Sequence, residues 1–188
     1  MVSELHQSLV LPTRIGALSI GARVTGPSLV EADLSLRALA FAPRLPPGMS
    51  TSACTAVLLR IAPEREVRTI RLHLELETPA IASPCTGECL DAQEWSDGGN
   101  LVVIGTQDSL ALDARYPGMG FAETLVVEFA PRAMTLDLDH RRIPDGASFH
   151  FIVAGNPDPE PVDASAWFAV DQPHEALLRL RQPPAAPD

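Results

Sequence analysis

The most regular pattern along the chain is the alternation of apolar and polar residues in "VRTIRLHLELE", residues 67–77. Ile70, Leu72, Leu74 and Leu76 alternate there with threonine, arginine, histidine and glutamate. Successive side chains of a β-strand point to opposite faces of the sheet. The pattern therefore predicts a strand with one face in the core and the other in solvent.

Strand-like runs of the same kind recur along the rest of the chain. They occupy residues 18–26, 29–42, 54–62, 100–105, 109–114, 124–130, 134–140, 148–155 and 165–171. Turn sequences such as "RLPPG", "SDGGN" and "RYPGMG" separate them, because Pro, Gly, Asn and Asp favour tight turns. This arrangement predicts about ten strands joined by short connections.

Residues 133–155, "AMTLDLDHRRIPDGASFHFIVAG", have the pattern of a β-hairpin. The turn would be Pro144-Asp145-Gly146, which offers a fixed φ, a side chain that bonds its own backbone and a residue tolerant of positive φ. The returning run "SFHFIVA" is apolar almost throughout. We expect it to lie centrally in a sheet that is covered on both sides.

Helical patterns are short and few. "PHEALLRL", residues 173–180, predicts two turns with Asp171 as a candidate cap, and residues 3–9 predict a second short helix. The polar stretch 78–100 is interpreted as a long connection, and residues 182–188 as a flexible tail. We expect one all-β domain over residues 1–181, an antiparallel β-sandwich or barrel-like variant with at most one or two short helices.

The composition narrows the classes of function. The net charge is −10 and all 14 basic residues are arginine, so no basic stripe is available for nucleic acid. The absence of lysine also excludes a lysine Schiff base and a P-loop. A lysine-free chain rich in Ala, Pro and Arg is typical of a GC-rich bacterial genome.

The segment "HLELETPAIASPCTGEC", residues 73–89, contains the ingredients of a zinc site. A zinc deaminase is excluded, because His73 and Glu75 fall within a strand and the cysteines are spaced C-x₃-C. A structural zinc site would combine Cys85 and Cys89 with Cys54 and His73. A Cys85–Cys89 disulfide and two free thiols are the alternatives; we expect free thiols, with no metal and no cofactor.

Two further places offer candidate catalytic residues. Asp137 and Asp139 point to one face of a strand and His140 follows them, which would suit a divalent cation. His150 lies in an apolar strand, where it fits a buried residue or the wall of a pocket with Trp167 and Tyr116. In each case the structural interpretation is the simpler one, and we do not expect an enzyme.

The chain has no pattern of membrane insertion or secretion. Glu4 stands where a signal peptide has basic residues, and no apolar run approaches the roughly 18 residues of a membrane span. Three cysteines, an odd number, fit a reducing compartment better than a disulfide framework. We expect a cytoplasmic protein that does not bind membranes.

Three functional classes remain. The first is a non-catalytic accessory, assembly or immunity-type protein that binds a protein partner, which the acidic charge suggests is basic; a homo-oligomer is compatible with it. The second is a small-molecule binder with a cavity inside the sandwich or barrel. The third is a metal-dependent enzyme that uses Asp137, Asp139 and His140.

Overall fold

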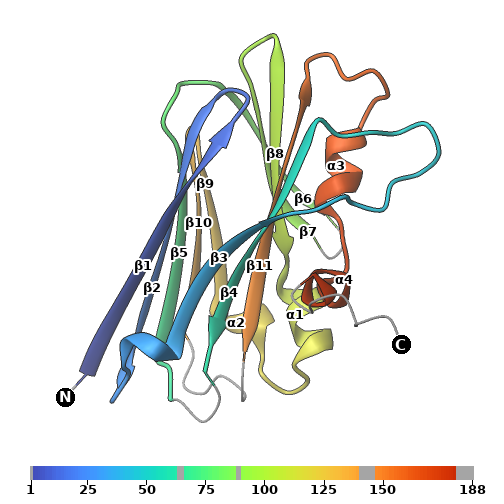
Figure 1. Ribbon diagram of the computed structural model, residues 1–188. Helices are drawn as coiled ribbons and strands as arrows, with labels where there is room; N and C mark the ends of the chain where they lie inside the picture. The colour runs from blue at the N-terminus through green and yellow to red at the C-terminus, as the bar shows by residue number, and fades with distance from the viewer. Residues whose placement is uncertain (1, 63–65, 88–89, 140–146, 181–188) are drawn as a thin grey trace, which may run out of the picture.

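The computed structural model describes residues 2–62, 66–87, 90–139 and 147–180. These residues form two antiparallel β-sheets packed face to face (Figure 1), which confirms the predicted sandwich. Sheet A has the strand order β1-β2-β5-β10-β9 and sheet B the order β3-β4-β11-β8-β7-β6. The strands are β1 (Val2–Thr13), β2 (Gly16–Pro27), β3 (Leu34–Ala40), β4 (Ala53–Ile61), β5 (Thr69–Leu76), β6 (Ile81–Gly87), β7 (Leu90–Ser96), β8 (Asn100–Gln107), β9 (Leu125–Ala130), β10 (Ala133–Asp139) and β11 (Ser148–Pro157).

The alternating segment forms β5, in the middle of sheet A. Its four apolar residues are buried, while Arg71 and His73 are exposed on the opposite face. The predicted orientation of this strand is therefore confirmed.

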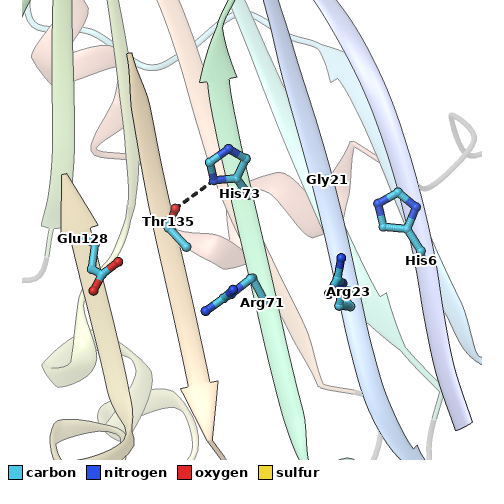
Figure 2. Close-up of a pocket in the computed structure, with 7 residues that line it drawn as sticks. All are labelled: His6, Gly21, Arg23, Arg71, His73, Glu128 and Thr135. Atoms are coloured by element: carbon cyan, nitrogen blue, oxygen red, sulfur yellow. Dashed lines mark hydrogen bonds between the residues drawn. The ribbon is translucent and has the colours of Figure 1, made fainter. Parts of the chain in front are cut away.

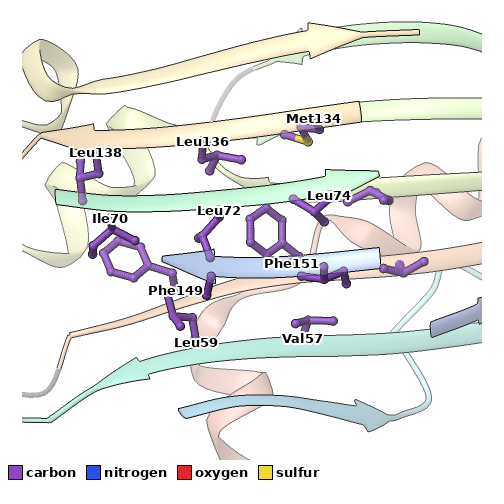
Figure 3. Close-up of a cluster of buried hydrophobic side chains, with 14 of the residues drawn as sticks. Val57, Leu59, Ile70, Leu72, Leu74, Met134, Leu136, Leu138, Phe149 and Phe151 are labelled. Atoms are coloured by element: carbon purple, nitrogen blue, oxygen red, sulfur yellow. The ribbon is translucent and has the colours of Figure 1, made fainter. Parts of the chain in front are cut away.

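The main hydrophobic core fills the space between the sheets (Figure 3). Leucines and Met134 of sheet A meet Phe149 and Phe151 of the facing strand β11. Fully burying a side chain of this size stabilises the fold by about 1.5–3 kcal/mol. The core therefore fixes which face of each sheet points outwards.

A second apolar cluster lies on the outer face of sheet B. Short helices α3 (Ser165–Val170) and α4 (His174–Arg179) cover that face at the C-terminal side of the chain (Figure 1). Ile152, Ala154 and Val103 of the sheet pack there against Ala169 and Leu177 of the helices. Strand β11 is thus buried on both faces, which confirms its predicted central position.

The predicted helix over residues 3–9 is wrong, because this segment belongs to strand β1. Leu5, Leu9 and Leu11 pack towards the core, while His6 and Val10 between them are exposed. This spacing has the period of two that defines a strand. The short window "SELHQSL" contains too few apolar residues to distinguish the two periods.

The predicted connection over residues 78–100 is also wrong, because it contains the hairpin β6–β7. Strand β7 buries Asp91 and Gln93 beside Trp95. Gln93 Nε2 donates to the carbonyl of Ala130, and the Trp95 indole N–H donates to the carbonyl of Pro131. The buried polar residues of this strand, of which Gln93 donates to the other sheet, made it resemble a loop.

Two predicted strands are helices. Residues 109–114 belong to α1 (Ser109–Arg115), where the Asp108 carboxylate caps the first turn by accepting from the Ala111 N–H. Residues 165–171 overlap α3, whose buried Ala166, Ala169 and Val170 form one helical face. The remaining short elements are α2 (Phe121–Thr124) and a 3₁₀ turn, η1 (Glu31–Asp33).

The predicted hairpin over residues 133–155 does not form. Strand β10 pairs with β5 and β9 in sheet A, whereas β11 pairs with β4 and β8 in sheet B. The two strands therefore belong to different sheets. The predicted helix at residues 173–180 is confirmed as α4, but its N-cap is Pro173, while Asp171 ends α3.

Several predicted features lie outside the described residues. They are the turn Pro144-Asp145-Gly146, the candidates His140 and Cys89, and the tail at residues 182–188.

Candidate binding site on the open sheet

Among the described residues, no helix covers the outer face of sheet A, in contrast to the helix-covered face of sheet B (Figure 1). Its exposed residues include His6, Arg23, Arg71, His73 and Asp139. They reach this face because each strand buries the alternate set of side chains in the core.

Strand register aligns these side chains in rows across the sheet. The central row is His6, Arg23, Arg71 and Asp137, each directly opposite the next on the neighbouring strand. A second row lies on one side of the central row and consists of Ser8, Gly21, His73, Thr135 and Glu128. A third row lies on its other side and consists of Glu4, Thr25, Thr69 and Asp139. Residues that are far apart in sequence thus form one continuous polar surface.

Two hollows indent this surface. The first, here the histidine hollow, has a volume of about 420 Å³ and is lined by His6, Gly21, Arg23, Arg71, His73, Glu128 and Thr135 (Figure 2). The second, the aspartate hollow, has a volume of about 300 Å³ and is lined by Glu4, Arg23, Thr25, Thr69, Ile70, Arg71, Asp137, Leu138 and Asp139. Both hollows share Arg23 and Arg71.

The two arginines have carboxylate partners on their outer sides. Arg71 donates from Nε and Nη2 to the two oxygens of Asp137, at 2.5 and 2.7 Å. This hydrogen bonding, and then the charge of Asp137, raises the pKa of Arg71. Arg23 Nε lies 3.3 Å from Glu4 Oε1. The guanidinium groups are thus held in place on the face.

His73 is oriented by its neighbours in the same way. Its Nδ1 lies 2.8 Å from Thr135 Oγ1, and its Nε2 lies 3.7 Å from a carboxylate oxygen of Glu75. Glu75 in turn pairs with Arg132 at 3.1 Å. The imidazole therefore stands in a defined position at the edge of the histidine hollow.

The aspartate pair is placed as predicted, with Asp137 and Asp139 on the same face of β10. Asp137, however, is engaged with Arg71. Within the described ranges, no three His, Cys, Asp or Glu residues are grouped as metal ligands. Asp137 therefore contributes to an ion-paired surface, and this geometry does not support a cation site.

The candidate zinc ligands do not come together in the structure. Cys54 is buried on β4 in sheet B, where burial raises the pKa of its thiol to about 12. His73 lies on the outer face of sheet A, and Cys85 is an exposed free thiol on β6. These three residues therefore cannot bind one ion.

His150 belongs to a buried polar cluster beneath α4. Its Nδ1 lies 2.8 Å from His174 Nδ1, and His174 Nε2 lies 2.8 Å from Ser148 Oγ. The imidazoles stack with centroids 5.0 Å apart. Tyr116 belongs to this cluster, because its hydroxyl accepts a hydrogen bond from the Ser148 N–H. Trp167 does not, because its indole N–H donates to Glu94.

The order serine, histidine, histidine has the connectivity of a proton relay, but burial disfavours the protonated form of both imidazoles. Burial, and then the charge of Arg115, lowers the pKa of His174 to about 4. Burial, followed by the charges of His174 and Arg115, also lowers the pKa of His150 well below its ordinary value. A general base works best with a pKa near the operating pH. The pair therefore joins α4 to β11 as neutral imidazoles.

The sequence could not indicate either site. His174 stands in a short helical pattern with no sign that it meets His150, and Arg23 and Arg71 become neighbours only through strand register. The one available signal was the charged set of alternating positions in β5, which marks a solvent-facing strand surface.

No helix in the described part of the chain is long and apolar enough to span a membrane. No known protein family, no curated protein and no solved structure matches the chain. The geometry and chemistry of its own surface are therefore what indicate its function.

Proposed function

We propose that this chain is a non-catalytic, cytoplasmic binding protein of the accessory, assembly or immunity type, which holds a protein partner on the outer face of sheet A. The observation that carries the proposal is the contrast between the two outer faces. Helices cover the apolar outer face of sheet B, whereas no described element covers the charged, hollowed face of sheet A. A wide, flat-to-concave surface suits a protein surface better than a small ligand, which needs a deep pocket.

The negative charge of the aspartate hollow supports a partner that places basic groups over that hollow. The aspartate hollow is lined by Glu4, Asp137 and Asp139, and the chain carries a net charge of −10. Complementary charge accelerates association and suppresses wrong partners. The expected partner therefore places arginine or lysine side chains near Glu4 and Asp139.

The other two functional classes have less support. Between the sheets, the hollow beside Phe149 has a volume of about 20 Å³ and the hollow beside Val102 and Val153 about 110 Å³, whereas ligand cavities have volumes of roughly 300–1,000 Å³. A small-molecule binder with an internal cavity needs much more space than that. The metal-dependent enzyme loses its main support because Asp137 is paired with Arg71.

Free thiols support the proposed compartment. Cys54 and Cys85 are both unbridged, and Cys85 is exposed. An exposed thiol persists more readily in a reducing compartment.

Photo-crosslinking in the source cells tests the proposal. Benzoylphenylalanine is placed at Ser8 or Ser19 on the outer face of sheet A, or at Ala38 on strand β3 of sheet B as a matched control. A photoreactive group is needed because amine-reactive reagents find no lysine in this chain. We expect one protein to be crosslinked from Ser8 and Ser19 and not from Ala38. Equal crosslinking from all three positions, or none, would contradict the proposed docking face.

A further inference from the structure

Arg23 and Arg71 stand in an unfavourable arrangement on sheet A. They are directly opposite each other on the adjacent antiparallel strands β2 and β5. Like charges at directly opposed positions destabilise a sheet. Each arginine has its carboxylate on the far side, Glu4 for Arg23 and Asp137 for Arg71, so no anion lies between the two guanidinium groups among the described side chains.

Both guanidinium groups retain unused donors. The side chains of Arg23 and Arg71 are 56% and 57% exposed. Asp137 engages only Nε and Nη2 of Arg71, and Glu4 lies nearest to Nε of Arg23. Within the described residues, Nη1 of Arg71 and both Nη groups of Arg23 make no hydrogen bond. They can donate to a ligand without breaking an existing pair.

Gly21 provides an independent observation at the same place. It lies in the interior of β2, where glycine weakens a strand and often marks a close approach by a ligand. Its backbone does not require glycine: an added Cβ would lie 3.7 Å from His6 Nε2 and 3.9 Å from the His73 carbonyl oxygen, which are ordinary contacts. The missing side chain instead leaves the floor of the histidine hollow clear.

Two imidazoles flank this clearing. His6 and His73 stand on either side of Gly21, with Arg23 and Arg71 beside them (Figure 2). One carboxylate, Glu128, also lines the hollow, and its charge acts on Arg71. Nitrogen-bearing side chains therefore outnumber acidic ones in the histidine hollow, in contrast to the aspartate hollow beside it.

We propose that the histidine hollow receives a carboxylate side chain of the protein partner, which lies over Gly21 and bridges Arg23 and Arg71. This inference rests on the proposed function and specifies the chemistry of its docking face. The planar arginine fork is suited to a carboxylate, and charge-assisted hydrogen bonds of this kind are stronger than neutral ones. The face then recognises a pair of opposite charges on the partner, acidic at the histidine hollow and basic at the aspartate hollow.

An NMR titration with a model ligand tests the assignment. The probe is an acetylated, amidated peptide of three glutamates, with the corresponding glutamine peptide and inorganic phosphate as comparisons. We expect saturable shifts of the Arg23 and Arg71 Nε–H signals and of the His6 and His73 ring signals, with a Kd on the order of 1 mM. The glutamine peptide should produce none of them.

Three variants locate the binding. Arg23→Gln should weaken binding of the glutamate peptide by about tenfold, as expected for a lost charge-assisted contact of roughly 1.4 kcal/mol. Gly21→Val should weaken it by a similar factor through filling the hollow, with every charge retained. Arg37→Gln, which removes an exposed arginine from β3 of sheet B, is the matched control and should leave binding unchanged.

The outcomes separate the two proposals. Peptide binding that survives both Arg23→Gln and Gly21→Val would overturn the carboxylate assignment. Phosphate that binds more tightly than the peptide at the same residues would reassign the hollow to a free oxyanion and also overturn it. If crosslinking from Ser8 and Ser19 persists in Arg23→Gln, the proposed carboxylate contact is overturned and the docking face is not. If the glutamate peptide binds but no protein is crosslinked, the proposed docking function is contradicted.

Discussion

The outer faces of sheets A and B show two ways to complete a β-sandwich. On sheet B, residues such as Ile152 and Ala154 are apolar and are covered by α3 and α4. On sheet A, the corresponding outer positions carry arginine, histidine and carboxylates, and remain exposed. The covered face therefore contributes apolar packing to stability, while the open face presents its charged groups to solvent.

Glycine shows the difference at single positions. Gly105 on β8 lies against α3, and an added Cβ would be 2.8 Å from the Cβ of Val170. The same change at Gly21 on the open face meets nothing closer than 3.7 Å. One glycine is required by packing, and the other is not.

The largest expected effect is a loss of stability in acid that arises on the covered face. The pKa of His174 is about 4 in the folded protein, against an ordinary value of 6.5, so the unfolded chain binds more protons between these values. The contribution is complete above pH 6.5 and is lost as the pH falls towards 4, amounting to roughly 3 kcal/mol for this residue. His150 acts in the same direction.

Urea denaturation at pH 7 and at pH 4.5 measures this effect. The variant His174→Gln should depend on pH less steeply than the parent protein, whatever its stability at pH 7. Arg115 opposes protonation of the pair and Glu175 favours protonation of His174, so both charges are retained in the variant. An unchanged slope in His174→Gln would show that the buried pair does not cause the acid sensitivity.

The second largest expected effect is a steric clash between β8 and α3. Gly105→Ala should destabilise the fold by about 1–3 kcal/mol, because Val170 and α3 must shift to admit the methyl group. Thermal unfolding followed by circular dichroism measures the change. A variant as stable as the parent would mean that α3 is not packed closely on β8.

Removing the central ion pair of the open face should have a smaller effect. Asp137→Asn leaves Arg71 without its bidentate partner, and exposed ion pairs contribute about 0–1 kcal/mol. The free energy of unfolding should fall by no more than that. Crosslinking to the partner from Ser8 should decrease, because the aspartate hollow loses one of the charges proposed to attract basic groups of the partner. A loss of several kcal/mol would instead show that this row contributes to stability as the covered face of sheet B does.

The smallest expected effect is that of Gly21→Ala. Alanine restricts the unfolded chain and meets only ordinary contacts at this position, so the variant should be as stable as the parent or more stable by up to about 1 kcal/mol. Differential scanning calorimetry of the Gly21→Ala and Gly105→Ala variants compares the two faces directly. Clear destabilisation by Gly21→Ala would contradict the view that this glycine serves binding.

The sequence determined the class of fold through local patterns. The alternation in residues 67–77 specified the buried and exposed faces of β5, and the apolar run at residues 148–154 specified the central strand β11. These patterns suffice because a period of two, sustained over several residues, fits only a strand. Short runs such as residues 109–114 and 165–171 were ambiguous, because their apolar residues also fit a helical face.

Only the tertiary structure decided how the strands pair and which side chains meet. The turn chemistry at residues 144–146 favoured a hairpin, yet β10 and β11 belong to opposite sheets, where each buries its own apolar face. Strand register alone places Arg23 beside Arg71, and the docking of α4 alone places His174 against His150. Local sequence specifies the face on which a residue lies, because that depends on backbone geometry; its neighbours depend on long-range burial, which no short segment contains.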